Sequence, residues 1–199
     1  MRAGYASPVK ISTMTPAPHL VLVGPMGAGK SSLGRRLAQA WGLRFIDLDR
    51  EIETRAGSDI PTIFACEGEA GFRRREREAL ADVLTDAGSV MATGGGAVLD
   101  PDNRALLRQH GFVVYLQIDV DEQLERLAHD RSRPLLAGAD RGEVLSRLAA
   151  ERAPLYAEVA DLHFSPAGLT PAEATERLAE RLEGCWQRPG IPHPLPDPS

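Results

Sequence analysis

One octapeptide, GPMGAGKS at residues 24–31, narrows the choice of fold more than any other part of this chain. It matches the pattern G-x-x-x-x-G-K-[ST], whose glycines allow backbone N–H groups to curl around phosphate oxygens. The apolar run before it, HLVLVG at 19–24, is typical of a buried strand that ends at a glycine. The segment after it, 30–42, has apolar residues on one helical face and ends at Gly42. A strand, a glycine-rich turn and a helix in this order predict a phosphate-binding loop.

The ligand that such a loop predicts is a nucleotide with its magnesium ion. The Lys30 ammonium is expected to reach the β- and γ-phosphates, and the Ser31 hydroxyl to bind Mg²⁺. The start of the following helix adds a partial positive charge, which favours an anion at that end. The loop residues expected to bind the nucleotide are Gly27, Ala28, Gly29, Lys30, Ser31 and Ser32.

The rest of the chain alternates between strand-like and helix-like segments. Strands are predicted at 43–49, 88–93, 112–118 and 161–165. Helices are predicted at 50–56, 69–87, 101–111, 121–130, 142–160 and 170–184. Pro154 is expected to interrupt its helix, and Thr170 is expected to cap the last one. The alternation is typical of an α/β protein whose parallel sheet is covered by helices on both faces.

In such sheets, ligands bind beyond the carboxyl ends of the strands, where three loops of this sequence are expected to meet. Besides the loop that starts at Gly24, these are the acidic pair Asp47 and Asp49 and the glycines at 94–96. Because the two aspartates lie two apart on an extended segment, they are expected to point to the same face. One would hold Mg²⁺ through water, the other would accept hydrogen bonds from substrate hydroxyls, and either is a candidate base. Asp49 alone could instead cap the next helix.

The three consecutive glycines, Gly94 to Gly96, need a reason of their own. Within regular structure each costs about 0.5–1 kcal/mol relative to alanine, and a plain turn needs only one or two. We therefore expect a loop whose bare backbone lies against a ligand. A side chain there would occupy the ligand's space and, at any position with positive φ, would add strain.

Several arginines are candidates for holding an anionic substrate. Those predicted to lie on a solvated helix face are Arg74, Arg75 and Arg77. Arg73 differs because it directly follows the aromatic Phe72, and Glu76 could orient it as an i,i+3 pair. The segment 130–142 combines arginines with glycine and proline, which suits a mobile lid over phosphates. Arg152 stands just before the predicted break in its helix.

Together, these motifs resemble the shikimate kinase family over residues 19–183. The marks of the family are GPMGAGKS, D-x-D at 47–49, G-F-R at 71–73, the triple glycine, RPLL at 133–136 and R-x-P-L-Y at 152–156. The resemblance implies a three-layer α/β/α fold like that of the nucleoside monophosphate kinases. Such a fold has a five-stranded parallel sheet, a substrate-binding region and a lid, here at 128–142.

The resemblance also implies an activity and a pathway. The reaction is ATP- and Mg²⁺-dependent phosphorylation of the 3-hydroxyl of shikimate, which gives shikimate 3-phosphate and ADP. It lies on the route to chorismate and the aromatic amino acids. The catalytic residues implied are Lys30, Asp47 and Arg133.

Individual binding roles follow from the same resemblance. Asp49 would hold the shikimate hydroxyls, while Arg73 and Arg152 would grip its carboxylate. The other residues implied to line the substrate pocket are Phe64, Phe72, Gly94, Gly95 and Gly96. Asp47 would support Mg²⁺ together with Ser31. The residues implied to contact ATP are Arg133 at the phosphates and Arg126 near the adenine.

One departure from the family concerns the base-contacting loop. The segment 161–173 carries no arginine where family members can have basic residues near the adenine. The nucleotide preference therefore stays open at this point.

Composition limits the remaining classes of function. A net charge of −5 and a pI near 5.6 argue against general nucleic-acid binding. Cys66 and Cys185 are too few and too far apart for a disulfide framework or a zinc site, which favours a reducing cytoplasm. No apolar run reaches the length of about 18 residues that a membrane span needs. Residues 1–18 are expected to form a flexible leader and residues 185–199 a disordered proline-rich tail. The sequence shows no apolar stripe of the kind that forms a subunit interface, so a monomer is expected.

Two other functions fit parts of the pattern. Another small-molecule P-loop kinase, acting on gluconate or a nucleoside monophosphate, would use the same loop and similar arginines. The G-F-R motif and the triple glycine favour a compact cyclic acid instead. A non-catalytic nucleotide switch would need a base-reading N-K-x-D motif, which the sequence lacks.

Overall fold

In the computed structural model, which describes residues 15–16, 19–86, 88–128 and 140–187, five parallel strands form the central sheet. Their order is β3-β4-β2-β5-β6. The strands are β2 (His19–Val23), β3 (Arg44–Asp47), β4 (Ser89–Ala92), β5 (Gly111–Leu116) and β6 (Leu162–Phe164). Every residue of β2, β4 and β5 is buried, as expected for strands covered on both faces. The predicted fold class is confirmed.

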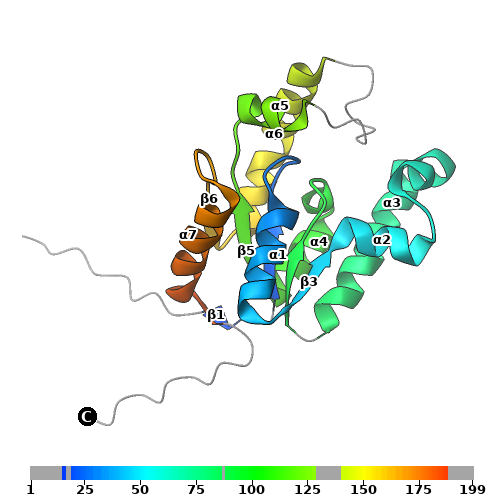
Figure 1. Cartoon of the computed structure of the whole chain (residues 1–199). Helices are drawn as coiled ribbons and strands as arrows, with labels where there is room; N and C mark the ends of the chain where they lie inside the picture. Colours follow the sequence, from blue (N-terminus) through cyan, green and yellow to red (C-terminus); the bar gives the residue numbers. More distant parts are fainter. Residues whose placement is uncertain (1–14, 17–18, 87, 129–139, 188–199) are drawn as a thin grey trace, which may run out of the picture.

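Helices pack on both faces of this sheet (Figure 1). They are α1 (Lys30–Trp41), α2 (Leu48–Ala56), α3 (Ile60–Thr85), α4 (Pro101–His110), α5 (Val120–Leu127), α6 (Arg141–Val159) and α7 (Pro171–Glu183), with a short 3-10 helix η1 (Ala97–Leu99). Successive side chains of β2 point to opposite faces of the sheet, so the core residues that pack on the two faces form two separate clusters. Leu20 and Leu22 belong to the cluster that holds apolar residues of α1 and α7, and Val21 and Val23 to the one that holds those of α3 and α6. None of the helices in the described ranges is long and apolar enough to cross a membrane.

Helix α6 differs from its prediction because it continues through Pro154. A proline inside a helix removes one backbone donor and costs about 3 kcal/mol. Residues on both sides of the proline are buried, which stabilises both halves as helix; they are Leu145, Arg152, Tyr156 and Val159. The predicted interruption is therefore wrong, and Arg152 lies within a continuous helix.

Helix α3 has a sharp bend that the sequence analysis did not predict. Gly68 leaves the helical region there, at φ 68° and ψ −175°. The bend separates a first arm, which carries Phe64, from a second arm, which carries Phe72 and Arg73. Arg75 closes the bend by holding the Glu67 carboxylate with two nitrogens, at 2.7 to 3.1 Å.

Two short parallel strands pair within the segments predicted to be a leader and a tail. They are β1 (Thr15–Pro16) and β7 (Trp186–Gln187). Trp186 is only 2% exposed, and its ring centroid lies 5.6 Å from that of Trp41 on α1. Trp186 therefore belongs to the folded part, although the sequence predicts a tail from residue 185, because this large indole is buried in the core. The other leader positions, and the tail from residue 188, lie outside the described residues.

Candidate active site

The phosphate-binding loop follows β2 and ends where α1 begins, at Lys30. Gly24 has a φ of +140°, and a Cβ there would lie 2.5 Å from the Leu116 carbonyl oxygen, so only glycine fits. Gly29 caps α1 without any side chain, and the first turn of α1 holds no acidic residue. The amides at this helix end are therefore open to an anion.

Lys30 lies across the loop rather than away from it. Its ammonium group donates hydrogen bonds to the carbonyl oxygens of Gly24, at 2.7 Å, and Pro25, at 2.8 Å. The residue is buried, so a fixed positive charge lies beside the amides that would receive phosphate oxygens. The loop and its lysine together can neutralise charge on a transferred phosphoryl group.

Ser31 and Asp47 form the pair of oxygen groups that suits magnesium. The Ser31 hydroxyl donates to Asp47 Oδ2 at 2.7 Å, and Asp47 is the last residue of β3. The described residues contain no group of three or more acidic, histidine or cysteine side chains that could cage a metal alone. The Ser31 and Asp47 oxygens suit Mg²⁺, which is usually held by one or two protein oxygens together with phosphates and water.

Asp49 does not lie on an extended segment, as the sequence predicted. Helix α2 begins at Leu48, so Asp49 stands in its first turn, where an acidic residue stabilises the helix dipole. The two aspartates consequently turn to different partners. Asp47 contacts the phosphate-binding loop, whereas a Cβ at Gly94 would lie 2.6 Å from Asp49 Oδ1.

Arg73 and Glu76 form the i,i+3 pair that the sequence predicted. Their closest atoms, Arg73 Nη1 and Glu76 Oε2, are 2.6 Å apart. Glu76 is fully buried, and this burial raises the pKa of its carboxyl although Arg73 acts in the opposite direction. Neither Glu76 Oε1 nor Arg73 Nε has a hydrogen-bond partner among the described residues, so both are candidates to bind a polar ligand.

Two of the three loop glycines, Gly94 and Gly96, are required by approaching side chains and not by their φ angles. None of the three glycines has a positive φ, so the strain suggested by the sequence is absent. A Cβ at Gly96 would instead lie 2.6 Å from Arg73 Nη1, and one at Gly94 would overlap Asp49. At Gly95 a Cβ would make only ordinary contacts, the nearest at 3.5 Å from the Tyr156 hydroxyl.

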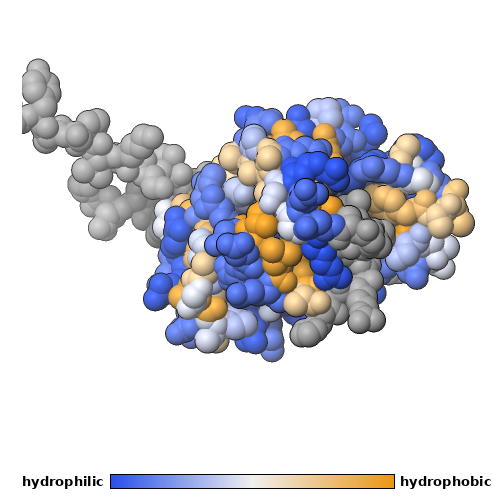
Figure 2. Space-filling view, turned by 90° about the horizontal axis from the view of Figure 1, so that it is seen from above, coloured by the Kyte–Doolittle hydropathy of each residue, from blue (hydrophilic) through white to orange (hydrophobic). Residues whose placement is uncertain are grey.

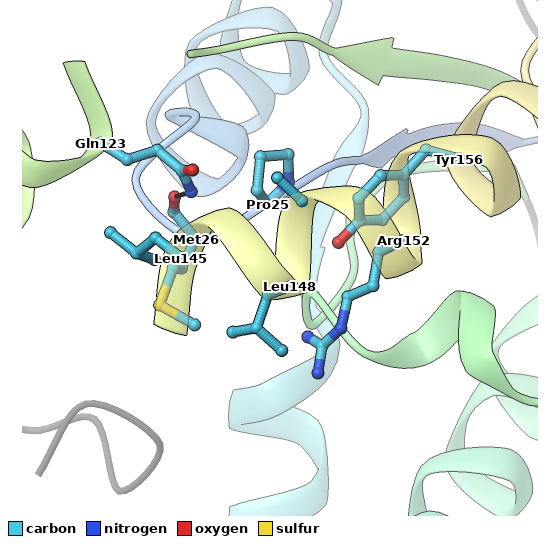
Figure 3. Close-up of a pocket in the computed structure, with 8 residues that line it drawn as sticks. Pro25, Met26, Gln123, Leu145, Leu148, Arg152 and Tyr156 are labelled. Atoms are coloured by element: carbon cyan, nitrogen blue, oxygen red, sulfur yellow. Dashed lines mark hydrogen bonds between the residues drawn. The ribbon is translucent and has the colours of Figure 1, made fainter. Parts of the chain in front are cut away.

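Arg152 joins the glycine side of the site to the phosphate-binding loop. It is 7% exposed, and its Nε has no partner among the described residues. With Tyr156 it lines a small pocket that also includes Pro25 and Met26 of the loop (Figure 3). Gln123 of α5 completes the pocket and donates to the Met26 carbonyl at 2.8 Å. Nothing in the sequence distinguished Gln123 from other polar helix residues.

The aromatic residues come from α3, whereas Arg126 comes from α5. Phe64 and Phe72 stack across the bend of α3, with ring centroids 4.8 Å apart, and the Arg73 guanidinium lies over the Phe72 ring. Arg126 donates to the Gly27 carbonyl at 3.1 Å, so it contacts the phosphate-binding loop. Its contact with adenine stays a prediction.

Other predictions fall outside this geometry. Arg133 and the lid positions 129–139 lie outside the described residues. Arg77, predicted to be solvated, pairs with Asp100 and Asp102 just beyond the glycine loop. Arg74 is exposed, as predicted.

Seen from above the carboxyl ends of the strands, apolar surface lies in the middle of this face with hydrophilic surface around it (Figure 2).

Comparisons with known proteins find shikimate kinases. The family model described as shikimate kinase matches residues 26–183. A shikimate kinase of Stenotrophomonas maltophilia (strain R551-3) is 58% identical over 175 residues, which are 88% of this chain and 97% of the relative. One from Xanthomonas campestris pv. campestris (strain 8004) is 53% identical over 179 residues, 90% of this chain and 99% of the relative. The solved structure of the Acinetobacter baumannii shikimate kinase in complex with shikimate has a TM-score of 0.79 and 43% identity, covering 84% of this chain and 94% of that one.

Proposed function

This chain belongs to the shikimate kinase family, and we propose that it transfers the γ-phosphoryl group of ATP to the 3-hydroxyl of shikimate. The products are shikimate 3-phosphate and ADP. The observation that carries this proposal is that the phosphate-binding loop and the glycine loop lie side by side. Ser31 and Asp47 meet at the phosphate-binding loop, while Asp49 and Arg73 reach the adjoining glycine loop.

Phosphoryl transfer depends mainly on positioning and on charge neutralisation, and the described residues can supply both. Lys30 and the α1 N-terminus would neutralise the transferred phosphate. Ser31 and Asp47 would hold Mg²⁺, which adds positive charge at the phosphates when bound.

On the other side, Arg73 and Arg152 would bind the carboxylate of the acid. Guanidinium groups suit this task because they can donate two parallel hydrogen bonds to a carboxylate. Asp49 would accept hydrogen bonds from the ring hydroxyls and so hold the 3-hydroxyl in line with the γ-phosphate.

The test is ADP release with ATP and Mg²⁺, comparing shikimate with gluconate and a nucleoside monophosphate. We expect saturable release with shikimate alone, and phosphorus NMR of the product should place the phosphate on the 3-hydroxyl. Release with another acceptor only would overturn the assignment of Asp49, Arg73 and the glycines. Tight nucleotide binding without turnover would favour the nucleotide switch.

Two accompanying proposals come from the sequence. A cytoplasmic location agrees with Cys66 and Cys185, which are both free thiols. A monomer is the oligomeric state that we propose, and sedimentation equilibrium measures it directly.

A further inference from the structure

We propose that Tyr156 is a positioning residue for the acid substrate, whose buried hydroxyl holds the glycine loop so that its backbone amides face the substrate. This inference rests on the proposed function, because it concerns how the same site binds its acid. It is carried by the hydrogen bonds of the loop, and it assigns a task to a residue that contacts the loop from helix α6.

The carbonyl groups of the three glycines are all held from within the protein. The Gly94 carbonyl accepts from the Ala97 amide at 3.2 Å, and the Gly96 carbonyl accepts from the Leu99 amide at 3.0 Å. The first bond closes the turn that leads into η1, and the second is the 3-10 bond of η1 itself. The Gly95 carbonyl accepts instead from the Tyr156 hydroxyl, 61 residues away in the sequence. Among the described residues, this hydroxyl is therefore the group that holds the middle carbonyl.

The amides of the same glycines behave differently. Within the described part of the chain, the N–H groups of Gly94, Gly95 and Gly96 donate to no backbone carbonyl. Arg73 lies against Gly96, and Asp49 lies against Gly94. Amides that donate to no backbone carbonyl and lie beside a guanidinium group are suited to an oxyanion such as a carboxylate.

The geometry of the peptide bond connects the two observations. In a trans peptide the C=O and N–H groups point in opposite directions. Holding the Gly95 carbonyl toward Tyr156 therefore aims the Gly96 N–H away from Tyr156. Glycines on both sides allow this peptide to rotate at little steric cost, so its orientation depends on a tether.

Tyr156 can fix the orientation of this peptide because its own side chain is held in place. It is 1% exposed, and its ring packs on Tyr115 with centroids 5.1 Å apart. Burial raises the pKa of the Tyr156 phenol above its ordinary value, so the hydroxyl keeps its proton and stays a donor at neutral pH. Its side chain points to the same pocket as Arg152, one helical turn earlier (Figure 3). The acid's guanidinium partner and the loop's tether thus come from one face of α6.

The experiment is Tyr156→Phe, which removes one hydroxyl and keeps the ring. The apparent KM and the calorimetric Kd for shikimate should rise between about threefold and tenfold, the range of one buried hydrogen bond. The KM for ATP should change by less than twofold, because the phosphate-binding loop keeps its contacts. Hydrogen exchange in the peptide that spans the glycine loop should become faster.

Tyr115→Phe is the matched control. Tyr115 belongs to the same aromatic stack, but the hydroxyl that donates to the Gly95 carbonyl is that of Tyr156. This variant should keep the shikimate KM and the exchange rate of the loop. The inference is overturned if Tyr156→Phe lowers the melting temperature yet leaves the shikimate Kd unchanged, or if it weakens ATP and shikimate equally. If the wild-type protein does not phosphorylate shikimate at all, the proposed function fails instead.

Discussion

The two halves of the active site are built in different ways. The nucleotide side, residues 24–31 with Asp47, consists mostly of consecutive residues that offer backbone groups and one lysine. The acid side is assembled from Asp49, Arg73, Glu76, the glycine loop and Arg152, which come from four separate segments. The first is a local structure, whereas the second exists only once helices α2, α3 and α6 have packed around the glycine loop. Substitutions should therefore separate the two halves functionally.

The largest effect should come from the nucleotide side. Lys30→Met removes the charge beside the transferred phosphate, and we expect kcat to fall by about 10²–10³-fold. Shikimate affinity, measured by calorimetry without nucleotide, should stay within twofold. Arg36→Met is the control, because Arg36 is an exposed cation on the same helix. A near-normal kcat in Lys30→Met would contradict the role of this residue.

On the acid side, Arg73→Ala should raise the shikimate KM by about 10- to 100-fold, the loss of a charge-assisted bidentate contact. The variant should also melt at a lower temperature, because the buried Glu76 carboxylate loses its partner. Arg74→Ala, its exposed neighbour on α3, should match the wild type in both steady-state kinetics and thermal melts. If Arg74→Ala and Arg73→Ala behave alike, general charge rather than a specific contact determines binding.

A smaller effect should distinguish two neighbouring glycines. A Cβ at Gly96 would displace the Arg73 guanidinium, while one at Gly95 would meet its nearest atoms at 3.5 to 3.6 Å. We expect Gly96→Ala to raise the shikimate KM about tenfold more than Gly95→Ala, in keeping with the loss of the arginine contact. Gly95→Ala should raise this KM only slightly and melt like the wild type. A collapse in the thermal stability of Gly95→Ala would mean that the loop is only a turn.

The smallest expected effect is a pH dependence of the free energy of unfolding, caused by a residue outside both halves of the active site. His19 is fully buried at the start of β2, its Nδ1 is 3.0 Å from the Ser89 hydroxyl, and burial lowers the pKa of its imidazole. Below the unfolded pKa of about 6.5, the unfolded chain binds a proton that the folded chain resists. The free energy of unfolding should therefore fall as pH drops below that value and stay level above it.

The measurement is urea unfolding of the wild type and of His19→Gln between pH 5 and 8. The difference between the two curves should change by no more than about 1.4 kcal/mol per pH unit, the limit for one proton. His163→Gln, an exposed histidine, is the control. A pH-independent difference between wild type and His19→Gln would show that the buried imidazole does not resist protonation. Shikimate and ATP kinetics at neutral pH should be unchanged in both variants.

The same contrast explains what could be predicted from the sequence. The phosphate-binding loop, the five strands and the Thr170 cap depend on neighbouring residues, so local patterns indicated them. The Arg73–Glu76 pair was also predictable, because it lies within one helical turn. The helical position of Asp49 was not, because the D-x-D spacing fits either a strand end or a first helical turn.

Other features depend on tertiary contacts that no local pattern reports. Helix α6 continues through Pro154 because the side chains around the proline are buried, and their burial outweighs the local propensity. The Glu67–Arg75 ion pair spans the bend at Gly68 and joins residues eight apart in the sequence. The tether from Tyr156 to Gly95 links residues that only the folded sheet brings together.

The measurement that tests the separation of the two sides most directly is a pair of calorimetric titrations of Arg73→Ala, one with shikimate and one with MgADP. We predict that the Kd for shikimate rises at least about tenfold, as expected for a lost charged hydrogen bond. The Kd for MgADP should stay within twofold of the wild-type value. Equal weakening of both ligands would contradict the account, because Arg73 would then support the whole site rather than its acid side.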